Sequence, residues 1–541
     1  MAHALRTLLV LAAATFSASA QLNGLPAIKP EAAAETSKYT ATSSSAQVET
    51  FCDQMPTASG LVRRLSLGKS HEGRDIPLLL IADPPVSNRE EAMERLRMPD
   101  TLLVLAIGNI HAGEVDGKEA LMMLSRDLAM SRKPLLQNII LAVVPNYNPD
   151  GNERLSTTNR PGQDGPSLGQ GQRENALGLD LNRDGIKLDA PETRALFKFI
   201  TQWDPHVFID AHTTDGSFHR YIMTTDGPKN PAGNAAIIEY SRDHFFPALF
   251  ERFRKANSAQ GWDAFFYGNF EDEFGPGGLP EQPRTHTRWE TFPAEPRYLT
   301  TCLGLRSLHS ILTESYTYAP YKDRVQAQYS YIKCALEQLA SEAPAIRTML
   351  QKADETTAAA HPDDLPIRTR MTSAPDKITI KGFIEKIEKG RSVPTLEAQE
   401  YSVTHYNRFE GIHIVKRPLG YVLSPQCPKE VIERLTLHGI AFEQITEPKT
   451  YNLSSFTITQ SKPASRPFQN RVLIRVDADV TPAAPVTVEP GSIVVSTAQP
   501  LGNLIVLMLE PCSEDGLATW GFFDAFLKAD EKPFPVRRVE R

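Results

Sequence analysis

Four short apolar runs separated by amphipathic stretches dominate the sequence between about residues 48 and 346. Apolar runs that alternate with longer helical patterns are typical of βαβ units, in which a crossover helix joins two parallel strands. The runs span 101–107, 138–144, 207–209 and 310–313. This alternation predicts an α/β domain with a mostly parallel or mixed sheet flanked by helices.

Two segments between the runs have the composition of helices. Residues 117–130 follow the first run, and residues 190–203 precede the third. The second segment begins with Pro191 and Glu192, which suit the first turn of a helix, and Asp189 is expected to cap it. Both segments therefore fit crossover helices that pack on the predicted sheet.

The chain is too long for one ordinary hydrophobic core, because its 541 residues predict several domains. We expect a catalytic domain over 47–346 and a linker over 347–377, where the sequence becomes polar and proline-rich. Residues 378–541 are mostly strand-like and predict a β-rich accessory domain. Its expected strands include 377–384, 472–476 and 504–509, with one helix near 428–437.

The N-terminus has the pattern of a secretory signal peptide over residues 1–20. Arg6 precedes an apolar stretch that ends in the small residues Ala18-Ser19-Ala20. The stretch is too short to span a bilayer, and no later segment is long and apolar enough, so no membrane anchor is expected. Residues 21–46, rich in Ala, Ser and Thr, predict a disordered leader. The sequence therefore indicates a secreted or periplasmic protein.

The composition argues against a nucleic-acid partner. The formal net charge is −7 and the isoelectric point is near 6.1, whereas nucleic-acid binding needs a basic face. The five cysteines form an odd set without a Cys-x-x-Cys pair, so at least one thiol is unpaired in a monomer. Neither a basic interface nor a cysteine-rich zinc module is predicted.

Reactive side chains follow the apolar runs at their C-terminal ends. His111 and Glu114 follow the first run, Asn148-Pro149-Asp150-Gly151 the second, Asp210-Ala211-His212 the third, and Glu314 the fourth. Ligands of open α/β sheets bind at this edge, so these groups are expected to converge. Each histidine alone is more often a hydrogen-bonded core or surface residue; the convergence of four ends favours a common site.

The residue types at these ends fit a catalytic zinc site with one Zn²⁺ per chain. Zinc accepts imidazole nitrogen and carboxylate oxygen, and a catalytic site leaves one position open for water. We expect His111, Glu114 and His212 to be the ligands. Glu314 is then available to move a proton between attacking water and a departing nitrogen.

A second group of polar residues lies in the segment Leu179-Asp180-Leu181-Asn182-Arg183. Asn182 and Arg183 suit bidentate capture of a carboxylate, such as the C-terminus of a peptide, although a lone arginine is more often a surface ion-pair partner. Asp180 alternates with Asn182, so it is expected to point elsewhere and to hold a ligand imidazole in the correct tautomer.

Together these motifs resemble the zinc carboxypeptidases of the carboxypeptidase A type. The resemblance covers roughly residues 48–345 and consists of His-x-x-Glu, Asn-Pro-Asp-Gly, Asp-x-Asn-Arg, a later His and a final Glu, in that order. It implies zinc at the C-terminal edge of the sheet and hydrolysis of a peptide bond near a free C-terminus. Glu314 would be the general base, and Asn182 and Arg183 would bind the terminal carboxylate.

The resemblance also implies an arginine that stabilises the oxyanion and a mobile tyrosine near the substrate. We assign the arginine to Arg160, with Arg154 and Arg173 as alternatives, and the tyrosine to Tyr298, with Arg297 or Tyr267 as alternatives for that region. Gly113 stands where digestive members of the family carry arginine, so their side-chain specificity does not transfer.

Three other functions remain open at this stage. Residues 165–169 fit the Gly-x-Ser-x-Gly pattern of serine hydrolases, but the polar, Gly- and Pro-rich context argues for a loop. A zinc-dependent deacylase or amidase acting on N-acyl amino acids would share the same ligands. An inactive relative that binds peptide or cell-wall material is the third. The favoured interpretation is an exported zinc carboxypeptidase whose partner is a peptide with a free C-terminal carboxylate. The oligomeric state is left open.

Overall fold

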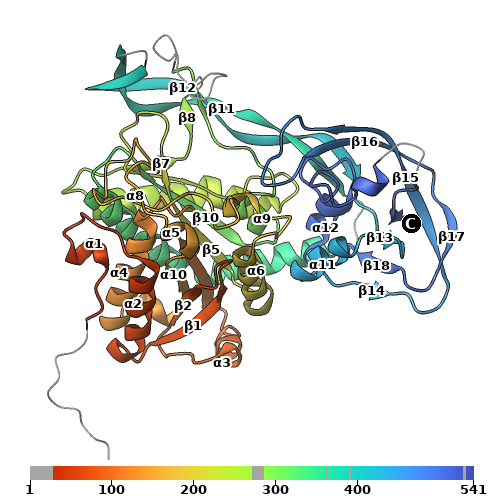
Figure 1. The fold of residues 1–541 in the computed structure, drawn as a ribbon, viewed down its shortest axis with the longest axis horizontal. Coiled ribbons are helices and arrows are strands. Elements are labelled where there is room, and N and C mark those ends of the chain that lie inside the picture. Colours follow the sequence, from red (N-terminus) through yellow and green to blue (C-terminus); the bar gives the residue numbers. More distant parts are fainter. Residues whose placement is uncertain (1–28, 271–285, 360–362, 389–390, 528–531) are drawn as a thin grey trace, which may run out of the picture.

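The computed structural model describes residues 29–270, 286–359, 363–388, 391–527 and 532–541. Figure 1 shows a larger body, which contains the N-terminal two thirds of the chain, beside a smaller C-terminal body. The predicted signal peptide at 1–20 lies outside the described residues. Within the described residues, no helix has the length and apolar character needed to cross a membrane.

The larger body contains an eight-stranded mixed sheet in the order β1-β2-β4-β3-β5-β10-β6-β7. The four predicted apolar runs form its centre, where β4, β3, β5 and β10 are parallel neighbours. The other pairings are antiparallel except β6 with β7. The strands are β1 Val62–Lys69, β2 Asp75–Ile81, β3 Leu102–Gly108, β4 Ile139–Val144, β5 Val207–Thr214, β6 Met223–Asp226, β7 Ala264–Phe266 and β10 His309–Tyr316. The α/β fold predicted from the sequence is confirmed.

Helices cover both faces of this sheet because its central strands are apolar on both sides. Val104 and Ala106 of β3 pack in the cluster that contains residues of α2, α4, α8 and α10. Leu103 and Leu105 face the opposite cluster, together with α6 and α9. These helices are α2 Ser45–Ala58, α4 Asp116–Met130, α6 Pro191–Trp203, α8 Phe246–Ala256, α9 Leu299–Gly304 and α10 Tyr321–Ala358.

Both predicted crossover helices are present, but the cap of the second differs. In α6, Ala190 is the N-cap and makes no side-chain capping bond, while Pro191 occupies the first turn. Asp189, the expected cap, instead accepts hydrogen bonds from Arg434 and Arg471 of the C-terminal body. The Asp189 carboxylate thus connects the larger body to the C-terminal body and does not cap α6.

The segment expected to be a loose leader is packed on the larger body where the structure describes it. It contains α1 Ala33–Thr36, and Ser43 is buried. The buried carboxylate of Glu119 accepts hydrogen bonds from the Ser43 backbone N–H at 2.7 Å, from Ser43 Oγ at 2.9 Å and from Thr42 Oγ1 at 2.8 Å. Small polar residues suit this buried polar contact, which the composition alone did not reveal.

Most of the expected linker is regular structure. Helix α10 continues to Ala358, and strand β11 Asp364–Glu388 begins shortly after it. Strand β11 pairs with β12 Arg391–Lys416 in a long antiparallel hairpin whose register shifts next to Pro366 and across the segment that contains Pro375. Prolines are tolerated in strands at such irregularities, which explains why a proline-rich stretch is extended here.

The smaller body contains a seven-stranded sheet in the order β14-β18-β13-β19-β15-β16, with β17 paired to β15. Helix α11 Lys429–Leu437 confirms the helix expected near 428–437. Residues 504–509, expected as a strand, belong to helix α12 Gly502–Leu509. Every residue from Leu504 to Leu509 is buried, and an all-apolar run carries no period that separates a helix from a strand.

The remaining elements complete this description of the chain. They are α3 Arg89–Arg95, η1 Pro134–Gln137, α5 Pro149–Asn152, η2 Leu181–Arg183, α7 Ala235–Glu239, η3 Tyr240–Phe245, β8 Asn269–Phe270, β9 Arg288–Glu290, β13 Gly420–Leu423, β14 Glu443–Gln444, β15 Lys449–Pro463, β16 Ile474–Val480, β17 Ala484–Val488, β18 Ile493–Ser496, η4 Asp524–Phe526 and β19 Val536–Val539.

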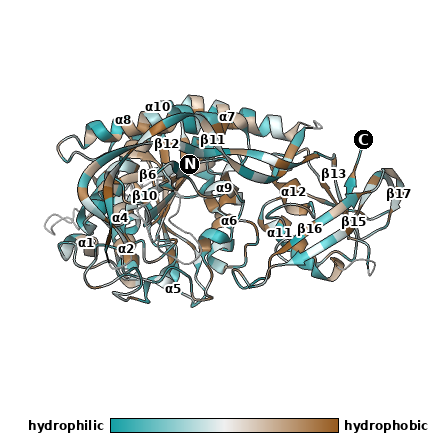
Figure 2. Ribbon diagram, turned by 90° about the horizontal axis from the view of Figure 1, so that it is seen from above, coloured by the Kyte–Doolittle hydropathy of each residue, from teal (hydrophilic) through white to brown (hydrophobic). Residues whose placement is uncertain are grey.

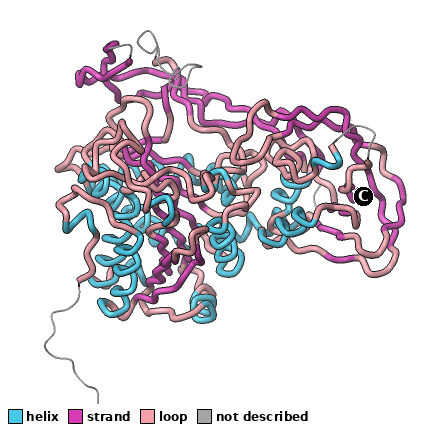
Figure 3. The backbone as a smooth tube through the Cα atoms, viewed as in Figure 1, coloured by secondary structure: helices cyan, strands magenta, loops and turns pink. Residues whose placement is uncertain are grey.

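One hydrophobic cluster runs through both bodies. It includes Leu105 and Phe197 from the larger body and Tyr421 and Trp520 from the smaller one. The β11–β12 hairpin also connects them, as the magenta tube along the top of Figure 3 shows, and Figure 2 gives the hydropathy of the same elements from above. All five cysteines are described, and each is a buried free thiol; Cys302, Cys427 and Cys512 belong to this cluster. The C-terminal body is therefore packed as part of one molecule.

Candidate functional site

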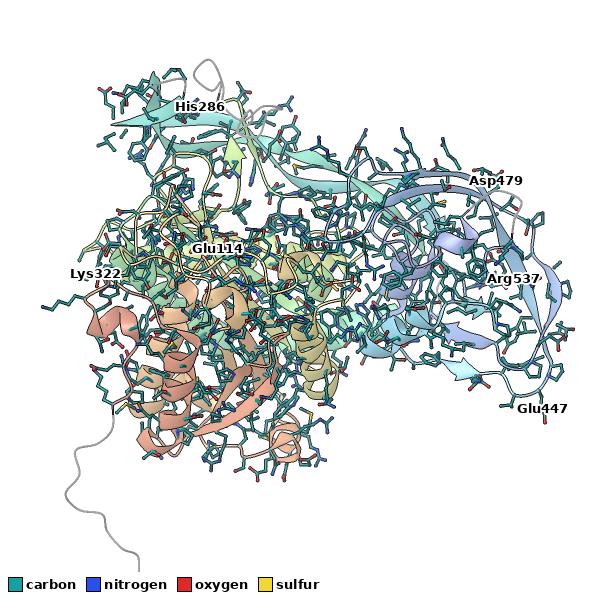
Figure 4. The ribbon with its side chains drawn as sticks, viewed as in Figure 1. Glu114, His286, Lys322, Glu447, Asp479 and Arg537 are labelled. Atoms are coloured by element: carbon teal, nitrogen blue, oxygen red, sulfur yellow. The ribbon has the colours of Figure 1, made fainter. Side chains whose placement is uncertain are left out.

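The ends of three central strands bring the predicted metal ligands and Glu314 together. His111 and Glu114 lie in the turn after β3, and His212 is on β5. Glu314 on β10 pairs in register with His212 on the neighbouring parallel strand. Figure 4 shows Glu114 in the interior of the larger body. The predicted convergence at the C-terminal edge of the sheet is present in the structure.

The turn after β3 is shaped by residues that permit a sharp change of direction. Asn109 adopts a left-handed backbone conformation with φ of 64°, and its amide donates hydrogen bonds to Asn146 and Asn152. A side chain at Gly117 would place its Cβ 2.5 Å from Ala211 Cβ, so glycine allows α4 to pack tightly on β5. These contacts place His111 and Glu114 beside His212.

The three candidate ligands are buried and present their donor atoms to one point. One donor atom from each of His111, Glu114 and His212 lies within 4.8 Å of the others. His111 Nδ1 is 3.0 Å from Glu114 Oε1, and His212 Nδ1 is 2.9 Å from Glu114 Oε2. Two imidazole nitrogens and a carboxylate form a donor set that suits Zn²⁺.

The far side of each imidazole faces a second carboxylate. His111 Nε2 lies 2.9 Å from Asp180 Oδ1, and His212 Nε2 lies 3.0 Å from Asp210 Oδ2. Metal-ligating histidines usually have such a partner, because it selects the tautomer whose other nitrogen faces the metal. The contact predicted for Asp180 is present, whereas the equivalent contact of Asp210 was not predicted. The surroundings of both histidines therefore fit a metal site.

The charges around the site favour a cation. Burial by itself lowers the pKa of His212, but the carboxylates of Asp210, Glu114 and Glu314 raise it well above its usual value. Burial by itself raises the pKa of Glu114, but His111 and Arg160 hold it well below its usual value. Opposite charges favour the ionised forms, so the negative charge of Glu114 that would attract a divalent cation is maintained in the buried site.

Glu314 stands apart from the ligand set. Its Oε2 atom is buried without a hydrogen-bond partner among the described residues. Burial raises its pKa to about 8, although the nearby positive charge of His212 opposes this shift. Catalytic carboxylates are commonly tuned upward in this way, so that they can both accept and return a proton near neutral pH. Its environment suits a general base.

A cavity with a volume of about 330 Å³ opens beside these groups. Asn182 and Arg183 line it, and the Arg183 guanidinium carbon lies 4.4 Å from the centre of the Tyr298 ring. Asn182 Oδ1 accepts a hydrogen bond from the Leu299 N–H at 2.9 Å, which fixes the orientation of the amide. The predicted carboxylate-binding pair and Tyr298 thus share one cavity with the candidate ligands.

Arg173, not Arg160, lies in the wall of this cavity. The Arg160 guanidinium is held by Glu114 Oε1 at 3.0 Å, by the Thr213 carbonyl at 2.9 Å and by Gln163 Oε1 at 2.8 Å. Arg173 lines the cavity and donates to Asp180 Oδ2 through Nε and Nη2, and 38% of its side chain is exposed. Arg154 pairs with Glu72 instead. The geometry therefore favours the alternative Arg173 over Arg160 for contact with a substrate.

Several cavity residues were not predicted for this wall. Phe292 lies between Tyr267 and Tyr298, with ring centres 5.6 Å and 5.0 Å away, so the three rings form an aromatic wall. Leu312 lines the cavity two residues before Glu314 on the same strand. The strand period could have indicated Leu312, because alternate residues share a face. No local pattern marks Phe292, which lies far from the motifs.

The serine-hydrolase pattern at 165–169 does not form a nucleophile elbow. Ser167 is exposed in a loop that neither follows a strand nor opens a helix. The prediction of a loop at residues 165–169 is confirmed, because a nucleophile elbow requires a strand before the serine and a helix after it.

Comparisons with known proteins agree with this geometry. Residues 48–184 match the family described as zinc carboxypeptidase. Carboxypeptidase 2 of Trichophyton rubrum is 22% identical over 493 residues, which cover 86% of this chain and 83% of the relative. Carboxypeptidase Z of Mus musculus is 30% identical over 177 residues, or 26% of this chain and 25% of the relative. The family match includes His111, Glu114 and Arg183.

Solved structures of carboxypeptidases also align with part of this chain. A metallo-carboxypeptidase from Burkholderia cenocepacia aligns with 16% identity and a TM-score of 0.38, covering 55% of this chain and 69% of that chain. Carboxypeptidase A from Helicoverpa armigera aligns with 14% identity and a TM-score of 0.39, covering 57% and 74%.

Proposed function

We propose that the chain is an exported zinc-dependent peptidase that releases C-terminal residues from peptides. The match of residues 48–184 to the zinc carboxypeptidase family supports this proposal. One observation carries the proposal. The buried set His111, Glu114 and His212 shares its cavity with Glu314 and with the carboxylate-binding pair Asn182 and Arg183. A hydrolytic centre and a group that recognises a free C-terminus thus lie side by side. The signal-peptide pattern of residues 1–20 supports export to a secreted or periplasmic location.

The side chains of His111, Glu114 and His212 would hold one Zn²⁺. When bound, Zn²⁺ supplies Lewis-acid polarisation at the coordination position that the three side chains leave open. Asp180 and Asp210 keep the two imidazoles oriented with Nδ1 toward the place where Zn²⁺ would bind. The donor types, their burial and these partners together support zinc as the cofactor.

Glu314 moves the proton in the proposed reaction. Its carboxylate accepts a proton from the attacking water and then delivers this proton to the nitrogen of the departing residue. Its buried Oε2 has no competing hydrogen bond among the described residues, so that oxygen is available to accept the proton.

Four other side chains would orient the substrate. Arg183 would pair with the terminal carboxylate, and Asn182, held by the Leu299 N–H, would donate its amide N–H to the same group. Arg173 would donate to the scissile carbonyl oxygen as negative charge develops there. Tyr298, stacked against the Arg183 guanidinium, would pack beside the terminal residue. The aromatic wall makes an apolar terminal side chain the better fit.

The proposal is tested by mass spectrometry of a peptide mixture incubated with the zinc-loaded full chain, with and without a chelator. Stepwise loss of single residues from the C-termini, abolished by the chelator, is the expected result. Peptides blocked by a C-terminal amide serve as the matched control and should stay intact, because they lack the carboxylate for Arg183. Hydrolysis of N-acyl amino acids alone would instead assign the chain to the deacylases. Absence of hydrolysis with zinc bound would favour an inactive peptide-binding relative.

A further inference from the structure

A two-residue turn of the C-terminal body reaches the segment that carries the site residues 180–183. In this turn, residues 468–471, the N–H groups of Phe468 and Arg471 donate to each other's carbonyl at 2.7 and 3.1 Å. The two central residues, Gln469 and Asn470, have φ of 53° and 60°. This left-handed conformation is costly for side chains larger than glycine, so hairpin turns of this kind usually contain glycine. The strained residues therefore need compensating contacts.

The side chain of Gln469 makes such a contact inside the site. Its Oε1 accepts a hydrogen bond from the backbone N–H of Asp180 at 2.7 Å. Asn470 contacts the same segment further away, where its Nδ2 donates to the Leu177 carbonyl at 3.1 Å. Gln469 is thus the residue of the turn that touches the backbone of a site residue.

The rest of the turn is held firmly, so the contact of Gln469 has a defined position. Arg471 binds both oxygens of Asp189, with Nε 2.7 Å from Oδ2 and Nη2 2.9 Å from Oδ1. The Phe468 ring stacks on Trp520, which is completely buried. Paired charge-assisted hydrogen bonds of this type fix both distance and direction. The turn can therefore act as a rigid support.

Asp180 is the residue through which this support acts. Its Oδ1 faces His111 Nε2 at 2.9 Å and accepts the Asn182 N–H at 2.8 Å. Its Oδ2 accepts from Arg173 at 2.8 and 3.0 Å. One carboxylate thus orients a metal ligand, a substrate-binding segment and the cavity arginine. A shift of the Asp180 backbone would displace all three together.

We propose that Gln469 is a positioning residue of the metal site, through which the C-terminal body orients Asp180 and thereby His111. This inference rests on the proposed zinc site. It assigns the C-terminal body a role in the proposed reaction, since the body supplies a hydrogen-bond acceptor that the segment 175–183 needs. Removal of Gln469 Oε1 should weaken metal binding even where the turn at residues 468–471 remains folded.

The test compares Gln469→Gly with Asn470→Gly in the full chain. Glycine relieves the left-handed strain at both positions and removes one hydrogen bond at each, so the Tm of the two zinc-free variants should change by a similar small amount. The Zn²⁺ Kd is measured by competition with a chromophoric chelator. Loss of a direct histidine partner typically costs about 10- to 100-fold in metal affinity. Since Gln469 acts one residue further out, we expect Gln469→Gly to weaken binding about 3- to 10-fold and Asn470→Gly to leave it unchanged.

Gln469→Met separates the acceptor from backbone freedom, because methionine keeps the length of the side chain and provides no comparable oxygen. It should weaken Zn²⁺ binding like Gln469→Gly. Wild-type affinity in either Gln469 variant would overturn the inference, as would equal weakening in Asn470→Gly. If the wild type itself binds no Zn²⁺, the proposed function fails first, which distinguishes the two failures.

Discussion

At the scale of single residues, the two imidazoles are each enclosed by carboxylates. His111 lies between Glu114 and Asp180, and His212 lies between Glu114 and Asp210. Glu114 on one side, and Asp180 or Asp210 on the other, fix the orientation of each imidazole ring. Glu314 is not one of these orienting carboxylates, so it is left for the proposed proton transfer.

The change Glu314→Gln should separate chemistry from metal binding. The amide keeps the size of the side chain but cannot accept the proton of the attacking water, so kcat should fall by about 10²- to 10⁴-fold. Zn²⁺ content, measured on the same preparation by atomic absorption, should stay at one per chain. His212→Ala is the contrasting variant and should lose the metal. Full turnover by Glu314→Gln would show that another group moves the proton.

Arg173 and Arg154 offer a matched pair for testing the oxyanion contact. Arg173 lines the cavity. Arg154 is not among the residues that line it and pairs with Glu72. Arg173→Ala should lower kcat by about 10²- to 10³-fold, because it removes a donor to the developing charge. Arg154→Ala should leave kcat near the wild-type value. Steady-state kinetics on one peptide substrate measures both, and the reverse ranking would assign the oxyanion contact to Arg154.

At the scale of elements, α11 is docked on the larger body through a buried histidine. His438 caps the end of α11, is fully buried, and places Nε2 3.0 Å from the Ile186 carbonyl. Its ring meets Phe197 at a centre distance of 5.0 Å. Burial, assisted by the positive charge of Arg306, lowers its pKa to about 3. The folded chain therefore keeps this imidazole neutral over most of the acidic range.

This histidine should make the molecule less stable in acid. The unfolded chain takes up a proton at His438 below its ordinary pKa of about 6.5, whereas the folded chain does so only near 3. Stability is therefore lost as pH falls from about 6.5 toward 3, by about 2 kcal/mol at pH 5 from this group. Chemical denaturation at pH 7 and pH 5 should show that His438→Leu lacks this loss. His244→Gln, at an exposed position, is the control, and parallel pH dependence of His438→Leu and wild type would contradict the argument.

At the scale of the whole molecule, the shared hydrophobic cluster should make folding a joint event. Trp520 is fully buried in the same cluster as Leu105 and Phe197. Trp520→Ala should lower the free energy of unfolding by about 3–5 kcal/mol through the cavity it leaves. Calorimetry should show one transition that shifts as a unit. Hydrogen exchange should report reduced protection in β3 and β5 as well as in α12. Two separate transitions, with only one displaced, would show that the bodies unfold independently.

The elements that could be predicted are those with a local pattern. The central strands, α4 and α11 follow from apolar runs and helical periodicity, and the convergence of His111, His212 and Glu314 follows from the rule for strand ends. Helix α12 was misassigned because its run is apolar at every position. The extended state of Pro366 depends on pairing with β12, which lies outside any local window, and Pro375 lies in an irregularity of the same hairpin.

The features that could not be predicted depend on the course of loops. Arg160 and Arg173 lie in one irregular segment, and only its folded path brings Arg173 to the cavity and folds Arg160 over Gly113, whose Cβ position would lie 2.8 Å from Arg160 Cδ. Gln469 has no motif, and its contact with Asp180 joins residues 289 positions apart. Long-range side-chain contacts of this kind leave no trace in spacing or composition.

That separation along the chain has a consequence for the order in which the protein is made. Translation runs from the N-terminus, so His111, Asp180, His212 and Glu314 all emerge before the turn at 468–471. The emerging polypeptide therefore contains every residue of the proposed catalytic set while the acceptor for the Asp180 N–H does not yet exist. A nascent or truncated chain would therefore hold its metal several-fold more weakly than the complete chain does.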